Sequence, residues 1–146
     1  MKKRIIFTVI LAVVLVLEIL PIGAVCNFAS PEGEAVRTTF SYFDLTPFGY
    51  ANYAPFFTAL LSCLLFFVSA VWCITGAANT ATALRNILIF TAVISLLPLV
   101  HGIAYYSVPG LAITLILIGE TVWLQLAINR AKRLIREKQA ESTKSE

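Results

Sequence analysis

Three ionisable side chains lie inside long apolar stretches of this sequence: Glu18, His101 and Glu120. An ionisable group inside a membrane costs a few kcal/mol or more, so such residues are candidates for function. Burial favours the neutral form of a carboxyl group, and a carboxyl that still exchanges its proton can relay protons or couple proton binding to transport. The sequence therefore predicts a polar site within a membrane, with Glu18, His101 and Glu120 as its candidate residues.

The spacing along the chain is compatible with a carboxyl–imidazole contact. At the helical rise per residue, Glu18 and His101 fall at similar depth in their apolar stretches, whereas Glu120 lies deeper. Three interpretations stay open for these groups: proton coupling, a structural hydrogen bond between helices, and contact with lipid or a partner. The structural bond has a ready acceptor, because Pro21 and Pro98 each leave a backbone carbonyl without its helical donor.

The sequence contains none of the common catalytic patterns. It has no zinc-type cluster of His and Cys, no G-x-S-x-G and no phosphate-binding glycine loop. Cys26, Cys63 and Cys73 form no C-x-x-C pair, and we interpret them as small apolar packing residues. We expect a non-enzymatic protein without metal or cofactor, and an intramembrane enzyme is the least favoured alternative.

The elements that must position these groups are hydrophobic helices. Of 146 residues, 59% are hydrophobic and 13% charged, a balance typical of integral membrane proteins. We expect an all-α protein with four transmembrane helices in a compact antiparallel bundle. The predicted spans are 5–25, 54–75, 82–105 and 108–129, within a transmembrane domain of residues 1–138 that is followed by a disordered tail at 139–146.

Basic residues set the expected orientation. Every Lys and Arg except Arg37 falls before the first span, near the turn between the second and third spans, or after the fourth. The positive-inside rule then places both termini in the cytoplasm and the loop 26–53 outside, in a plasma membrane. The basic start and apolar run also fit a cleaved secretory signal, but the run is long and Glu18 interrupts it, which favours a retained span.

The loop 26–53 is rich in aromatic residues. One interpretation is a loop on the bilayer surface with a short helix around 40–45, because aromatic rings favour the headgroup zone. The alternative is a site for a ligand or partner. The candidate residues of this outer loop are Phe40, Tyr42, Phe43, Asp44, Phe48 and Tyr50.

The segment after the fourth span is strongly basic. We expect it to extend the helix along the membrane surface and to contact anionic lipid headgroups, in preference to RNA or a protein partner. No nucleic acid is expected. The candidate lipid contacts are Arg130, Lys132, Arg133, Arg136 and Lys138.

The stretch Leu17-Glu18-Ile19 resembles the small multidrug-resistance transporters, which also carry a carboxylate in the first of four short spans. Those transporters lack a long aromatic loop after that span, and their Gly-rich third helix and later tryptophan have no counterpart in this chain. We therefore carry over neither their activity nor their sites. We expect an accessory or interaction component that forms a homo-oligomer or binds a membrane protein. The rival hypothesis is a proton-coupled small-molecule transporter that uses Glu18 and Glu120.

Overall fold

Long helices dominate the structure, a computed structural model that describes residues 1–29, 35–50 and 52–144. The four long helices are α1 (Lys2–Ile19), α3 (Ala54–Thr75), α4 (Ala78–Leu96) and α5 (Val108–Lys144). The shorter elements are the strands β1 (Ala24–Ala29) and β2 (Ala35–Phe40), the helix α2 (Thr46–Gly49), and the 3-10 turns η1 (Leu97–His101) and η2 (Ile103–Tyr105).

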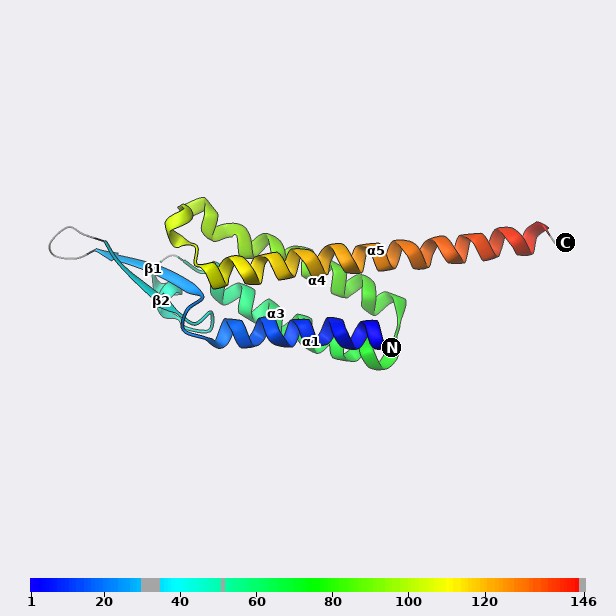
Figure 1. Cartoon of the computed structure of the whole chain (residues 1–146), viewed down its shortest axis with the longest axis horizontal. Helices are drawn as coiled ribbons and strands as arrows, with labels where there is room; N and C mark the ends of the chain where they lie inside the picture. Colours follow the sequence, from blue (N-terminus) through cyan, green and yellow to red (C-terminus); the bar gives the residue numbers. More distant parts are fainter. Residues whose placement is uncertain (30–34, 51, 145–146) are drawn as a thin grey trace.

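The four long helices pack side by side as a bundle. α1 contacts α3 and α5, and α4 contacts α3 and α5, so the packing closes on itself. The β1–β2 hairpin lies beyond one end of the bundle, and both termini lie toward the other (Figure 1). We call these the hairpin end and the basic end. The second half of α5 runs well past the basic end (Figure 1).

Three of the helical segments are long and apolar enough to cross a membrane: Ala54–Thr75, Ala78–His101 and Val108–Glu141. This indicates a membrane protein. α1 has 18 residues and carries basic residues at its start and Glu18 near its end, so it falls outside this group. The fourth span stays a prediction.

On α3, small polar residues lie inside the bundle beside the apolar core, and several large apolar residues lie outside. Thr58, Ser62 and Ser69 line the buried face of α3. On the same helix, Phe67 is 68% and Ile74 87% exposed. This distribution suits lipid, because helices in a membrane associate through close packing of small residues and not through exclusion of water.

The end of the first helix differs from the prediction of a span over 5–25. α1 ends at Ile19, and Leu20 is already extended, with φ −66° and ψ 139°. Pro21 explains the early end, because a proline disfavours the helical conformation of the residue before it. Pro21 therefore terminates the helix, where the sequence analysis placed it inside the span.

The loop 26–53 is more regular than predicted, and the protein is not all-α. β1 and β2 form an antiparallel two-stranded sheet, in which Ala24 pairs with Phe40 and Ala29 with Ala35. Residues 35–40 include Val, two Thr and Phe, which are residue types common in strands. The sequence therefore contained an indication of β2. The short helix lies at Thr46–Gly49 and not at 40–45.

The last two spans also have different bounds. α4 begins at Ala78 and changes to 3-10 turns at Leu97, where a helix was predicted over 82–105. Pro98 accounts for the change, since it cannot donate a helical hydrogen bond. α5 continues as a helix to Lys144, through most of the predicted disordered tail. Residues of high helix propensity fill this extension.

Candidate functional site

Glu18 lies on the buried face of α1. That face repeats at helical spacing through Phe7, Leu11 and Val14, and Glu18 is the next buried residue, with no exposed surface. The Ser62 hydroxyl of α3 donates a hydrogen bond to Glu18 Oε1 at 2.8 Å. The other oxygen, Oε2, has no hydrogen-bond partner among the described residues. The Glu18 carboxyl group therefore joins α1 to α3 through one of its two oxygens.

The backbone of Glu18 anchors the segment that follows β2. Its carbonyl accepts hydrogen bonds from the Tyr42 amide at 2.9 Å and from the Ser41 hydroxyl at 3.1 Å. The last carbonyls of a helix have no partner within that helix. Ser41 and Tyr42, which follow β2, supply the missing donors for the Glu18 carbonyl. These bonds fix the hairpin to the end of α1.

Tyr42 fills a closed space between two glycines. Its side chain is 5% exposed. A Cβ atom at Gly23 would lie 2.8 Å from the Tyr42 ring, and one at Gly110 would lie 3.1 Å from its hydroxyl oxygen. At Gly23 a side chain would displace the Tyr42 ring, and at Gly110 it would press tightly against the Tyr42 hydroxyl. Burial, with smaller contributions from Tyr106 and Glu18, raises the pKa of Tyr42 above its ordinary value, so its hydroxyl stays neutral.

Ser107 connects the start of α5 to the turn after α1. Its hydroxyl donates to the Gly23 carbonyl at 2.5 Å and accepts from the Gly110 amide at 2.9 Å. The second bond is an N-cap, which satisfies one of the free amides at a helix start. Ser107 followed by Pro109 is a recognisable helix-start pattern, but its partner Gly23 could not be read from the sequence.

Two further side chains hold the hairpin. Arg37 on β2 donates to the Tyr106 carbonyl at 2.9 Å, and the buried Asn52 amide donates to the Val25 carbonyl at 2.9 Å. Asn52 does not cap α3, because the N-cap of that helix is Tyr53, which makes no side-chain cap bond. We call the described residues between α1 and α3 (20–29, 35–50, 52 and 53) the cap.

The candidate outer-loop residues divide into three groups. Tyr42 is buried and Phe40 packs against the core, so both are structural. Asp44 accepts a hydrogen bond from the Thr46 amide at 2.8 Å, and its bonds with Thr46 lower the pKa of its carboxyl. The side chains that remain exposed are Phe43 (36%), Phe48 (41%) and Tyr50 (62%).

Phe48 belongs to a group of touching rings that crosses from the cap to α3. Its ring centroid lies 5.9 Å from those of Tyr53 and Phe56 and 6.1 Å from that of Phe57. We call Phe48, Tyr53, Phe56 and Phe57 the aromatic cluster. Tyr53 and Phe57 are 43% and 44% exposed, so the cluster forms a continuous apolar surface at the hairpin end.

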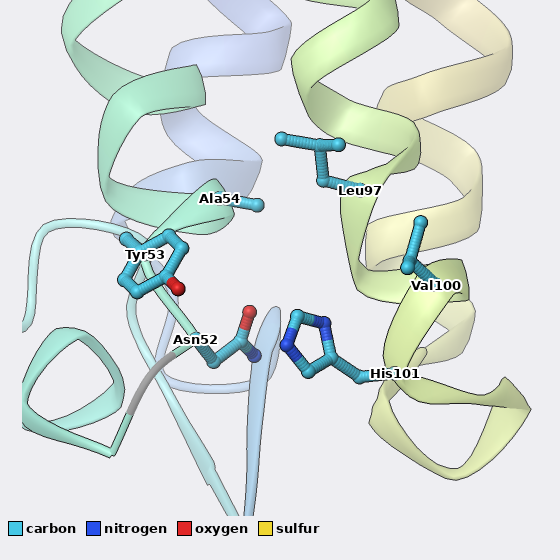
Figure 2. A pocket seen from close by; sticks show the side chains of 6 residues that line it. All are labelled: Asn52, Tyr53, Ala54, Leu97, Val100 and His101. Carbon is cyan, nitrogen blue, oxygen red and sulfur yellow. The ribbon is translucent and has the colours of Figure 1, made fainter.

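His101 lies apart from Glu18, at a small cavity of about 100 Å³ between η1 and the start of α3. Figure 2 shows its ring facing the Asn52 side chain across this cavity. The imidazole contacts the Tyr105 ring, with centroids 5.9 Å apart. Within the described part of the chain, Glu18 bonds to Ser62 and not to His101, so the carboxyl–imidazole contact is not formed.

Glu120 is the second buried carboxyl. It is 5% exposed on α5, and its Oε2 has no hydrogen-bond partner in the described chain. No hydrogen bond between the described residues joins Glu120 to Glu18. The two carboxyls therefore do not form one site in this structure.

The basic candidates lie at and beyond the basic end of the bundle. All are exposed on the second half of α5, whose end runs past the other helices (Figure 1). Lys132 also lines a cavity between α5 and the neighbouring helices. The exposed residues of this group are Arg130, Lys132, Arg133, Arg136 and Lys138.

Searches with family models, with curated proteins and with solved structures find no match to this chain. Among the described residues, no group of three His, Cys, Asp or Glu side chains could hold a metal ion.

Proposed function

We propose that this protein is a non-enzymatic accessory component of the plasma membrane, which binds a membrane protein or a second copy of itself through the exposed side of the cap. The observation that supports this proposal is the attachment of the cap. Side chains and amides from the cap bond to α1, to the start of α5 and to each other, while the aromatic cluster stays exposed.

A rigid aromatic surface is well suited to binding. Aromatic side chains are enriched in protein interfaces, where they bury much area with few rotatable bonds. Preorganisation lowers the entropy lost on association. The hydrogen bonds of Ser41, Asn52 and Ser107 fix the cap before a partner arrives.

The membrane arrangement is part of the proposal. α1 acts as a fourth span, since it packs against α3 and α5 and, apart from Thr8, is apolar from Ile5 to Leu17. The basic end faces the cytoplasm, because basic residues collect there. Arg37 is the exception at the hairpin end, and its bond to the Tyr106 carbonyl gives it a structural role.

Photo-crosslinking in native membranes tests the binding surface. A photoreactive phenylalanine replaces Phe48 or Tyr50 on the cap, or Val93 on the side of α4 as a matched control that is 56% exposed. After illumination, mass spectrometry identifies the linked peptide. We expect links from positions 48 and 50 to one membrane protein or to a second copy of the chain, and only lipid adducts from position 93. Lipid adducts alone at all three positions would overturn the proposal.

A second candidate function, proton-coupled transport of a small molecule, is supported by the unpartnered oxygens of Glu18 and Glu120. Transport needs a route to these groups, yet Glu18 has no exposed surface, and five cavities among the described residues are lined by other side chains. Carboxyl infrared bands of the protein in lipid distinguish transport from the accessory role. The bands are assigned with the variants Glu18→Gln and Glu120→Gln. A band lost between about pH 6 and 8 supports transport, and bands that persist support the accessory role.

A further inference from the structure

One cavity at the basic end has a volume of about 260 Å³, and all four long helices border it. It has a cationic part and an apolar part. Among its lining residues are Arg4 from α1, Trp72 and Gly76 from the end of α3, and Leu124, Lys132 and Ile135 from α5.

The position of Arg4 is fixed by two neighbours. Its guanidinium lies 5.4 Å from the centroid of the Trp72 ring, within the range of a cation–π interaction. It also fits against Gly76, where a Cβ atom would overlap the guanidinium. Gly76 has φ +65°, a conformation that other residues rarely adopt. The cation is therefore held at a defined place in the cavity wall.

Lys132 supplies a second positive charge to the same cavity. Within the part of the chain that the structure describes, neither Arg4 nor Lys132 forms an ion pair with an acidic side chain. Two cations around one cavity attract an anion that carries several oxygen acceptors, and phosphate has this character.

The apolar part of the cavity distinguishes a lipid from a soluble phosphate. Leu124 and Ile128 line it on α5, together with the ring of Trp72. The cavity also lies where α3 ends at Thr75 and α4 begins at Ala78, at the ends of two membrane-crossing segments. When the headgroup of a lipid lies at the end of α3, the acyl chains of the same lipid lie alongside the apolar helices.

We propose that this cavity binds the phosphate of an anionic phospholipid, with Arg4 and Lys132 as its ligands and Trp72 beside the first part of an acyl chain. The site shares Lys132 with the exposed basic stretch of α5, and it differs from the rest of that stretch because Arg4 of α1 and the Trp72 ring also belong to it. Arg4 is positioned by Trp72 and Gly76, so this site selects one lipid molecule in a defined place.

Quenching of Trp72 fluorescence tests the site. The chain carries Trp72 and Trp123, and Trp123→Phe makes Trp72 the sole reporter. The protein is placed in phosphatidylcholine nanodiscs that contain either phosphatidylglycerol or phosphatidylcholine with acyl chains brominated near the headgroup. We expect stronger quenching by the anionic lipid. Arg4→Gln and Lys132→Gln should each lower this preference about five-fold, since each basic residue adds about 1 kcal/mol near an anionic surface.

Matched controls separate a site from general attraction. Lys138→Gln removes one charge from exposed α5 and should leave the preference almost unchanged. Arg4→Lys keeps the charge and should retain most of the preference for the anionic lipid. If Arg4→Gln fails to fold, Lys132→Gln decides, because Lys132 is exposed on α5. Equal quenching by the two lipids, or an equal loss in Lys138→Gln, would overturn the proposal. Reversal of the quenching by inorganic phosphate would also overturn it, in favour of a soluble ligand.

Discussion

The two ends of the bundle differ in whether their polar side chains have partners within the described chain. At the hairpin end, hydroxyl and amide groups of Ser41, Asn52 and Ser107 bond to backbone carbonyls of other segments. At the basic end, Arg4 and Lys132 border a cavity, and the described residues provide no acidic partner for them. Internal bonds of the first kind fix structure, whereas unpaired cations of the second kind are available to a ligand.

This comparison assigns different effects to substitutions at the two ends. Changes at the hairpin end should lower the stability of the fold. Changes at the basic end should alter lipid preference with a smaller effect on stability. The predictions below test this difference, beginning with the largest expected effect.

Removal of the Tyr42 ring should have the largest effect on stability. Tyr42→Ala leaves a cavity between Gly23 and Gly110 and should lower the free energy of unfolding by about 3 kcal/mol, as for other buried aromatic residues. Thermal or denaturant unfolding in detergent measures the change. Tyr50→Ala is the matched control, because Tyr50 is 62% exposed, and it should cost far less. Equal losses for the two variants would contradict the closed packing around Tyr42.

The bond between Ser62 and Glu18 should give the next largest effect. Ser62→Ala removes the donor from a buried carboxyl group, which should cost about 1 to 3 kcal/mol of unfolding free energy. Glu18→Gln keeps an oxygen that can accept the Ser62 hydroxyl and should cost less. Denaturant titration compares the two. A Glu18→Gln variant that is as unstable as Ser62→Ala would show that the second carboxyl oxygen also has a structural role.

Local signals in the sequence predicted part of this arrangement. The apolar stretches predicted all four long helices. Pro21 and Pro98 marked the places where the helices end, although the sequence analysis placed both within spans. The chemistry of a proline is local, so its effect can be read from the sequence.

The remaining features depend on contacts between distant residues. The Ser107 bond to the Gly23 carbonyl joins positions that are 84 residues apart, and the Ser62 bond to Glu18 spans 44. No pattern of spacing specifies such pairs. The spacing was compatible with a contact of Glu18 with His101, but the contact is not formed, because similar depth in the membrane does not place two helices side by side. The sequence likewise contains no indication that Arg4 and Gly76 are in contact.

Gly76→Ala extends the comparison to the basic end. The left-handed conformation of Gly76 costs other residues about 1 kcal/mol, and the added methyl group displaces the Arg4 guanidinium. We expect a loss of stability near that value together with a loss of the anionic lipid preference of Trp72. Gly49→Ala is the control, since a Cβ atom there meets nothing within 4 Å. A Gly76→Ala protein that keeps its lipid preference would show that the position of Arg4 is not required.

The smallest effect is expected from the protonation of Asp44 at the start of α2. Its bonds to Thr46 lower the pKa of the carboxyl, so the folded state binds the proton less readily than the unfolded chain does. Their stabilising contribution is then complete at neutral pH and is lost as the pH falls through the ordinary range of an aspartate, near about 4, and below. The amide signal of Thr46, followed by NMR in detergent, should shift over this range, and Asp44→Asn should remove most of the shift. Because Asp44 is only partly buried and its bond joins residues two positions apart, we expect the unfolding temperature to change far less than it does in Tyr42→Ala. A large loss of stability at this pH would instead indicate that the start of α2 supports the whole cap.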